Sequence, residues 1–232
     1  MLRFRDETLA YGGTAVLTGL DFRIEAGERV VLLGRSGAGK STLLAAAYRR
    51  LAETRDDVAL VPQEHGLVPQ LSVFHNVFMG RLDAHGAAYN LANLVWPFPS
   101  ERRRVGAAIE AVGLSGLDRR TVESLSGGQK QRTALARAFH RGGALLIADE
   151  PVSAVDERQA AQLTEAIAAR FETALVALHD VALARTFATR LVGLRAGRIL
   201  FDRKADEVGD EEIRRLYGAG STIDPPGDAA DA

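Results

Sequence analysis

A glycine-rich loop between a strand-like run and a helix-like run constrains the fold of this 232-residue chain more than any other segment. Residues 30–33 read Val-Val-Leu-Leu, as expected for a buried strand, and residues 41–47 read as a helix. Between them stands Gly34-Arg35-Ser36-Gly37-Ala38-Gly39-Lys40-Ser41. Its glycines let backbone N–H groups approach an anion, and the helix N-terminus adds a positive dipole end. The segment therefore predicts an α/β fold with a phosphate-binding loop.

Two side chains of this loop predict a nucleotide as the ligand. Lys40 is expected to reach the β- and γ-phosphates of ATP, and the Ser41 hydroxyl to enter the shell of Mg²⁺. A glycine-rich hairpin with an exposed lysine is the alternative, but the strand and helix that the motif requires are both present. The residues expected to bind the nucleotide here are Gly34, Arg35, Ser36, Gly37, Ala38, Gly39, Lys40, Ser41 and Thr42.

An acidic pair follows a second apolar run. Residues 145–148 read Leu-Leu-Ile-Ala and end in Asp149-Glu150. Ligands of open α/β sheets gather at the carboxyl ends of the strands. Asp149 is expected to hold Mg²⁺ through water, and Glu150 to polarise the attacking water as a general base. A solvated acidic turn would look the same in isolation, but the phosphate-binding loop favours the catalytic interpretation.

A second candidate anion site begins at Leu125-Ser126-Gly127-Gly128-Gln129. The residues after it have apolar side chains at helical spacing, at positions 134, 135, 138 and 139. Ser126 is a good N-cap, and the two glycines leave the N–H groups of the helix start open. The segment therefore predicts another helix N-terminus able to bind phosphate.

These motifs, in this order, resemble those of the nucleotide-binding subunits of ABC transporters, over residues 1–218. In that family the loop from Gly34 to Thr42 is the Walker A motif, residues 125–129 are the signature, and residues 145–150 are the Walker B strand. The resemblance implies an ABC cassette of the P-loop NTPase fold. It also implies an ATPase that converts ATP and water to ADP and phosphate.

The resemblance assigns four further residues. Gln63, which ends the apolar run of residues 58–61, is similar to the glutamine that senses the γ-phosphate and Mg²⁺. His179, after the apolar run of residues 174–177, is similar to the catalytic switch histidine. Asp156 lies in a D-loop whose Val155 stands where leucine is commoner, and Tyr11 resembles the aromatic that stacks on adenine.

The resemblance also implies the partners. Ser126, Gly127, Gly128 and Gln129 of one chain would grip the ATP held by the P-loop of a second copy, which gives an ATP-sandwich dimer. Two transmembrane permease subunits would carry the dimer at the cytoplasmic face of the membrane. A substrate-binding protein outside the membrane would act through the permease.

The organisation expected from the pattern is a mainly parallel sheet flanked by helices, with a helical subdomain at about residues 64–140. Residues 101–112 predict a clear helix, residues 85–96 a less regular segment, and residues 219–232 a disordered tail. Only 23 positions separate Lys40 from Gln63, fewer than is usual in the family. A reduced antiparallel β part is therefore expected.

Composition excludes several other classes. The net charge of −1 gives no basic field for nucleic acid, and the absence of cysteine excludes a disulfide framework. The charged start of the sequence does not resemble a signal peptide, and no apolar run approaches the roughly 20 residues of a transmembrane helix. A transport role would therefore require separate membrane subunits.

The substrate is indicated by resemblance alone. Residues 67–82, together with residues 149–152 and 194–197, resemble the ATPase of phosphonate importers, which implies a phosphonate or a related phosphorus oxyanion. Amino-acid import, small-molecule export, a soluble ABC ATPase and a small-molecule kinase remain as alternatives. Apolar residues after Gln63 are expected to form the groove for a permease helix, with Phe74 and Phe78 as the residues to test.

Overall fold

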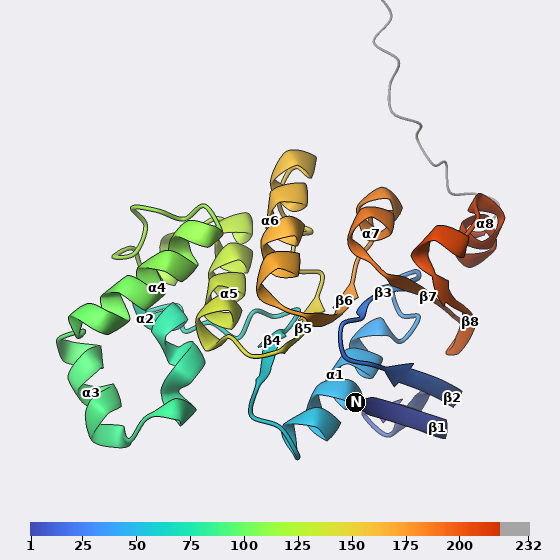
Figure 1. The fold of residues 1–232 in the computed structure, drawn as a ribbon, viewed down its shortest axis with the longest axis horizontal. Helices are drawn as coiled ribbons and strands as arrows, with labels where there is room; N and C mark the ends of the chain where they lie inside the picture. The colour runs from blue at the N-terminus through green and yellow to red at the C-terminus, as the bar shows by residue number, and fades with distance from the viewer. Residues whose placement is uncertain (219–232) are drawn as a thin grey trace, which may run out of the picture.

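A six-stranded sheet forms the centre of the molecule, seen here in a computed structural model that describes residues 1–218 (Figure 1). The strand order is β4-β5-β6-β3-β7-β8, and every neighbouring pair is parallel except β7 and β8. The strands are β3 (Arg29–Leu33), β4 (Val58–Val61), β5 (Leu145–Asp149), β6 (Thr173–Ala177), β7 (Arg190–Arg195) and β8 (Arg198–Lys204). The expected mainly parallel sheet is confirmed, and the tail expected at residues 219–232 lies outside the described residues.

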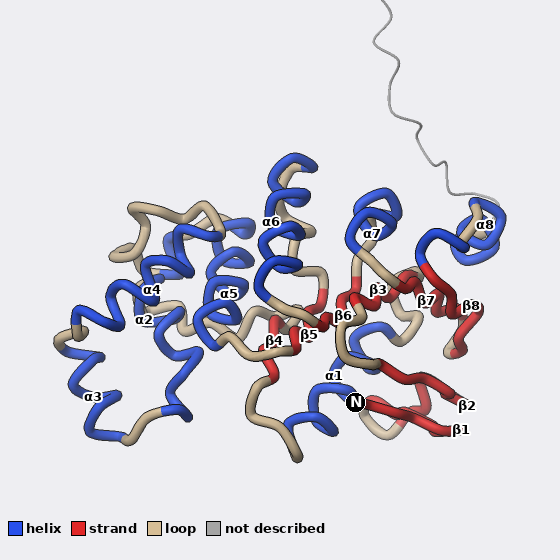
Figure 2. Tube along the Cα trace, viewed as in Figure 1, coloured by secondary structure: helices blue, strands red, loops and turns tan. Residues whose placement is uncertain are grey.

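The two faces of the sheet are covered by different elements (Figure 2). One face packs on α1 (Lys40–Ala52) and on a separate antiparallel pair, β1 (Leu2–Tyr11) and β2 (Thr14–Ile24). The other face packs on α5 (Gly127–Arg141), α6 (Glu157–Arg170), α7 (Val181–Phe187) and α8 (Asp210–Tyr217). Along β3, Val30 and Leu32 pack on the face covered by α1 and the β1–β2 pair. Val31 and Leu33 pack on the face covered by α5, α6, α7 and α8. This alternation explains why the whole strand is apolar.

The antiparallel part is small, as the sequence predicts. It consists of β1 and β2, which are joined at Gly12 and Gly13. From the end of α1 to the start of β4 the chain has no strand. The short spacing between Lys40 and Gln63 is therefore accommodated by a loop.

The segment between β4 and α5 is helical. It contains α2 (Val73–Phe78), the 3₁₀ helix η1 (Met79–Ala84), α3 (Ala87–Val95), α4 (Pro99–Ala111) and the 3₁₀ turn η2 (Val122–Ser124). A third 3₁₀ turn, η3 (Ala205–Glu207), precedes α8. The helix expected at residues 101–112 is confirmed as α4, which begins at a proline.

The expectation of an irregular segment at residues 85–96 was wrong, because most of it is α3. Hydrophobic periodicity does not reveal this helix, because its polar side chains face the protein. The amide of Asn90 donates to the backbone oxygens of Leu82 and His85, and the Asn93 amide donates to the backbone oxygen of Tyr89. The usual inward apolar stripe is absent.

A buried histidine makes the stability of this part pH-dependent. His140 of α5 lies with Nε2 3.7 Å from Oε2 of Glu101 in α4, and both side chains are buried. Burial lowers the pKa of His140 from 6.5 to about 4, with Glu101 opposing the shift and Arg81, Arg104 and Arg170 adding to it. The folded state therefore holds a neutral imidazole that the unfolded chain protonates below pH 6.5.

We expect protonation of His140 to lower the free energy of unfolding by about 3 kcal/mol as the pH drops from 6.5 towards 4. Stability is fully present above pH 6.5 and is lost with acid, because the folded-state pKa is the lower one. Urea unfolding of the parent and of His140→Gln across this pH range measures the effect. The free energy of unfolding of His140→Gln should fall less with acid than that of the parent. If both proteins showed the same pH dependence, His140 would not have this role.

Candidate functional site

The strand order brings the predicted catalytic segments to one edge of the sheet. The P-loop follows β3, Glu150 follows β5, His179 follows β6, and Gln63 follows β4. Because β4, β5, β6 and β3 are consecutive and parallel, all four segments leave the sheet at its carboxyl edge. The arrangement that the sequence predicts from separate motifs is thus a continuous row in the structure.

The P-loop takes a conformation that two glycines make possible. Gly34 has a φ of 148°, and a Cβ there would lie 2.3 Å from the backbone oxygen of Leu194. Gly39 has a φ of 105°, and a Cβ there would lie 2.8 Å from a methyl carbon of Leu17. A side chain at either position would force the loop away from β7 or β2. The loop therefore packs directly on the sheet and opens into α1.

Lys40 is held inside this loop. Its Nζ donates to the backbone oxygen of Gly34 at 2.7 Å and to that of Arg35 at 3.3 Å, and the residue is only 5% exposed. Burial lowers the pKa of the Lys40 ammonium, while the charges of Glu150 and Asp149 oppose the shift. A cation held in a glycine loop without a direct acidic partner is suited to bind an incoming phosphate.

Asp149 offers a carboxylate oxygen for a cation. The residue is buried at the end of β5, and its Oδ1 is a buried oxygen with no hydrogen-bond partner. Burial raises the pKa of Asp149, and the Ser41 hydroxyl and the charges of Lys40 and His179 partly offset this rise. An unpartnered oxygen beside a hydroxyl fits the oxygen ligands that Mg²⁺ prefers. Among residues 1–218 there is no group of three or more histidine, cysteine, aspartate or glutamate side chains that could hold a metal ion by itself.

Asp149→Asn should raise the stability of the nucleotide-free protein and lower its ATP turnover. The folded state raises the pKa of this carboxyl, so ionised Asp149 destabilises the nucleotide-free fold at neutral pH and the amide removes that cost. We expect the free energy of unfolding without nucleotide to rise, and Mg²⁺-dependent ATP turnover to fall by at least about 100-fold. Thermal unfolding and a phosphate-release assay measure the two. A variant that is less stable and fully active would contradict this assignment.

Glu150 and His179 form a direct pair. Nε2 of His179 contacts Oε1 of Glu150, and neither side chain is fully buried. Glu150 lies just beyond β5 with a positive φ of 50°, and its N–H donates to the backbone oxygen of Ala177 in β6 at 3.1 Å. This local turn directs the carboxylate out of the strand and towards the histidine. A base and a histidine in contact at the sheet edge can polarise a water beside a bound phosphate.

The signature segment forms the start of α5, as predicted. Ser126 is the N-cap: its Oγ accepts from the N–H of Gln129, and the Gln129 side chain accepts from the N–H of Ser126. A Cβ on Gly128 would lie 2.4 Å from the backbone oxygen of Ala154, whereas Gly127 has open space around it. Within the described chain no hydrogen bond joins this helix start to the P-loop. Gly127, at the first position of α5, is exposed, so this helix start is open on its outer side.

Two residues of α5 connect the site without belonging to any motif used above. The Gln131 amide donates to the backbone oxygen of Glu150 at 2.5 Å and to Oγ of Ser153 at 2.9 Å, and its Oε1 accepts from the N–H of Ala154. Arg137 donates to the backbone oxygens of the two residues at positions 65 and 66, just after Gln63, at 2.5 and 2.6 Å. The signature helix is thus fixed to both the catalytic turn and the Gln63 loop. Only their position about one turn and almost three turns after the start of α5 could have pointed to them.

The remaining predicted residues lie at the ends of elements. Tyr11 ends β1 and is 78% exposed, so its ring is free to stack on a base. Gln63 is exposed two residues beyond β4. Asp156 is the N-cap of α6, where Oδ1 accepts from the N–H of Gln159 at 2.8 Å. The roles given to these three residues stay predictions.

Three of the apolar residues after Gln63 belong to the core, and this corrects the choice of Phe78 as a surface position to test. Phe78 is 2% exposed, and Val73 and Val77 are fully buried. Phe74 is partly buried and its ring stacks on that of Phe78. A charge at Phe78 would unfold the protein rather than test a surface. The large exposed apolar side chains of this region lie further along, between Leu82 and Phe98.

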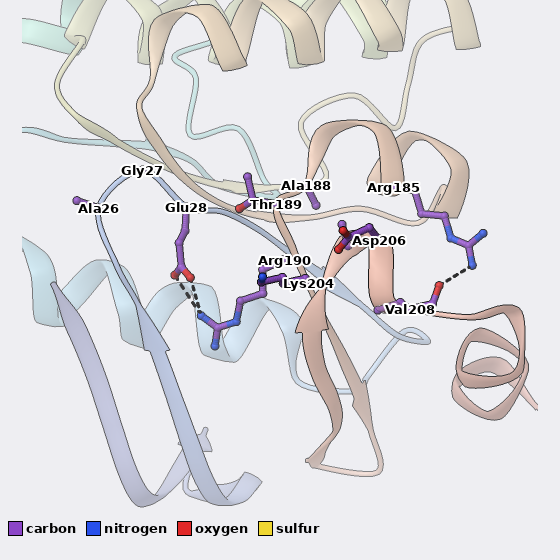
Figure 3. A pocket seen from close by; sticks show the side chains of 11 residues that line it. Ala26, Gly27, Glu28, Arg185, Ala188, Thr189, Arg190, Lys204, Asp206 and Val208 are labelled. Atoms are coloured by element: carbon purple, nitrogen blue, oxygen red, sulfur yellow. Dashed lines mark hydrogen bonds and ion pairs between the residues drawn. The ribbon is translucent and has the colours of Figure 1, made fainter.

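A separate cavity of about 820 Å³ lies at the opposite edge of the sheet (Figure 3). Its lining comes from the turn before β3, the start of β7 and the end of β8. Arg190 inside it pairs with Glu28 and Asp202, and Arg185 pairs with Asp210. Because β3 begins here and the P-loop follows its other end, this cavity is not part of the predicted nucleotide site.

The strand order and the P-loop between β3 and α1 define the fold of a P-loop nucleotide-binding protein. The family model of the ABC transporter matches residues 17–153, and the chain belongs to this family. No helix within residues 1–218 has the length and apolar character needed to cross a membrane.

Curated relatives match nearly the whole chain. The "Phosphonates import ATP-binding protein PhnC" of Bacillus thuringiensis subsp. konkukian (strain 97-27) is 33% identical, over 94% of this chain and 95% of the relative. The protein of the same name from Frankia casuarinae is 36% identical, over 94% of this chain and 96% of the relative.

Solved structures of ABC cassettes share the fold. The dimeric cassette MJ0796 bound to ADP and Pi is 23% identical, with a TM-score of 0.72 over 88% of this chain and 99% of that chain. CbiO1 from Clostridium perfringens is 22% identical, with a TM-score of 0.69 over 92% of each chain. The ABC cassette fold expected from the motifs is confirmed.

Proposed function

We propose that this chain is the ATP-hydrolysing subunit of an importer for phosphonate or a related phosphorus oxyanion. The contact of Glu150 with His179, in the strand row that also holds the P-loop, is the observation that carries the ATPase assignment. The substrate class rests on the relatives, which are named for phosphonate import. No residue of the described site selects a phosphonate, because the transported molecule would pass through the permease.

The residues divide the work of hydrolysis. Lys40 and the N–H groups of the P-loop neutralise the β- and γ-phosphates, and Tyr11 stacks on the adenine. Glu150 accepts a proton from the attacking water, and His179 orients the carboxylate and contacts the γ-phosphate. Mg²⁺, when bound to ATP, would neutralise charge on the phosphates and be held by Ser41, Gln63 and Asp149.

A second copy of the chain would complete the site. The start of α5, with Ser126, Gly127 and Gly128, is a helix N-terminus of the kind that binds phosphate, and this supports a role on the ATP of another copy. Two copies related by a two-fold axis can place each such end on the ATP of the other. Asp156 is the N-cap of α6 and lies two residues after Ala154, whose N–H donates to Gln131 of α5, and we expect it to contact the second copy.

The expected wider assembly contains two permease subunits and a substrate-binding protein that acts through them. The chain would then work at the cytoplasmic face of the membrane, attached through the permease. The experiment is reconstitution of the chain in liposomes with the permease and the binding protein that adjacent genes encode. Loaded binding protein should raise ATP turnover when it carries a phosphonate and leave it at the basal rate when it carries an amino acid. Stimulation by the amino acid alone would overturn the substrate assignment while leaving the ATPase assignment in place.

A further inference from the structure

Helix α3 has its polar side chains inside and its apolar side chains outside. Asn93 is fully buried and its Oδ1 accepts from the N–H of Phe98 at 2.9 Å, while Tyr89 donates through its hydroxyl to Oε1 of Glu101 at 3.2 Å. The opposite face carries Leu91 and Val95, which are 64% and 77% exposed. A helix on the surface of a globular protein normally shows the reverse pattern.

The exposed face continues past the end of α3 into the following turn. We define the α3 patch by its exposed apolar members, Leu91, Leu94, Val95, Trp96 and Phe98. Residues 84–100 contain no aspartate, glutamate, lysine or arginine, so no charge interrupts the patch. A contiguous apolar surface of this kind marks a contact with another molecule or with a membrane.

The patch lies on the side of α3 that faces away from the protein. Tyr89, Asn90 and Asn93 are the more buried side chains of the helix, whereas Leu91 and Val95 are exposed. In Figure 1, α3 lies at the end of the molecule opposite α8. An exposed apolar helix face can lie in the interface plane of a bilayer.

Positive charge borders the patch. Three arginines follow it at the start of α4, and Arg102 places its guanidinium 5.8 Å from the centre of the Trp96 ring. Arg104 pairs with buried Glu101, but Arg102 and Arg103 make no ion pair within the described residues. Exposed tryptophan and leucine beside free arginines are the combination found where a helix lies in the interface of an anionic bilayer.

We infer that the α3 patch docks on the anionic lipid surface of a membrane, with Leu91, Val95 and Trp96 in the interface and Arg102 and Arg103 on the lipid phosphates. This goes beyond the proposed function, because attachment through a permease requires no lipid contact. It would give the ATPase a second, direct hold on the membrane beside which it works.

Trp96 is the single tryptophan of the chain, so it reports on this contact directly. The purified chain is mixed with phosphatidylcholine vesicles that contain or lack phosphatidylglycerol, and no permease is present. With the anionic vesicles we expect co-flotation, a blue shift of tryptophan emission and quenching by brominated lipid. Phosphatidylcholine alone should bind at least about tenfold more weakly.

Matched variants locate the contact. Leu91→Asn/Val95→Asn keeps Trp96 and should abolish the blue shift, whereas Leu200→Asn, at an exposed apolar position on β8, should not. Arg102→Gln/Arg103→Gln should weaken binding about tenfold or more. Arg49→Gln/Arg198→Gln makes the same charge change on other elements and should have little effect. Circular dichroism and basal ATP turnover check that each variant is folded.

Several results would overturn the inference. These are no binding to anionic vesicles, binding that the patch variants leave unchanged, or equal binding to both vesicle types. A blue shift without vesicles that depends on protein concentration would show a second copy covering the patch. Binding only to detergent-solubilised permease would show a protein partner. None of these outcomes bears on ATP hydrolysis, so the proposed function is tested separately.

Discussion

Replacing Glu150 by glutamine should reduce ATP turnover by at least about 100-fold while ATP still binds. The amide keeps the size of the side chain and its place beyond β5, but it cannot accept the proton of the attacking water. Its contact with His179 also loses its charge. The phosphate loop and Lys40 are untouched, so the affinity for ATP should stay within a few-fold of the parent.

The same variant should accumulate an ATP-bound dimer, because the nucleotide that joins two copies is no longer consumed. Size-exclusion chromatography with MgATP and a phosphate-release assay measure the two effects. Glu165→Gln, an equal change at an exposed position of α6, is the control and should behave as the parent. A Glu150→Gln protein that hydrolyses ATP normally would remove the base assignment, and one that stays monomeric when saturated would count against the sandwich.

Lys40→Ala should weaken ATP binding itself, by roughly 10- to 100-fold. Lys40 is the buried cation of the loop, and its removal leaves the triphosphate without its main charged donor. Turnover falls as a consequence of lost binding. This order of effects distinguishes Lys40 from Glu150, whose loss spares binding.

Isothermal calorimetry with MgATP measures the loss of ATP affinity, and Lys204→Ala provides a control at an exposed lysine. Lys40 also donates to the backbone oxygens of Gly34 and Arg35, so its removal could change stability. Thermal unfolding of both proteins without nucleotide should therefore be measured as well. Equal ATP affinity in Lys40→Ala and the parent would exclude Lys40 from the phosphate site.

The sheet and its loops could be predicted because local chemistry determines them. The strand before Gly34 is apolar on both faces, and the loop contains glycines where a Cβ would meet Leu194 or Leu17. The N-cap of α5 is predictable for the same reason, since Ser126 and Gln129 satisfy each other over three residues. The apolar strand, the glycine-rich loop and the cap are all visible in the local sequence, although the contacts of the glycines with Leu194 and Leu17 appear only in the fold.

The errors came from residues whose role depends on tertiary contacts. Helix α3 was missed because Asn93 is buried by hydrogen bonds instead of by an apolar stripe. Phe78 was chosen as a position to test although it is buried, because nothing in the local pattern shows which residues after Gln63 face out. Gln131 and Arg137 were not selected because their partners, the catalytic turn and the Gln63 loop, meet them only in the folded molecule.

The central claim is that ATP is hydrolysed between the P-loop of one copy and the α5 N-terminus of another. It can be tested by mixing two inactive variants. Lys40→Ala disables the phosphate loop but keeps the signature. Gly127→Asp keeps the phosphate loop but places a carboxylate where the γ-phosphate should lie. Position 127 has open space for a side chain, so this variant should fold, and Gly127→Ala is its matched control.

In a mixed dimer, the intact P-loop of the Gly127→Asp chain faces the intact signature of the Lys40→Ala chain. One complete site is therefore restored, and a one-to-one mixture should recover up to roughly a quarter of the parent turnover, because half of the dimers formed at random are mixed. If each chain held its whole site alone, the mixture would show only the sum of the two residual rates, and the account given for this protein would be contradicted.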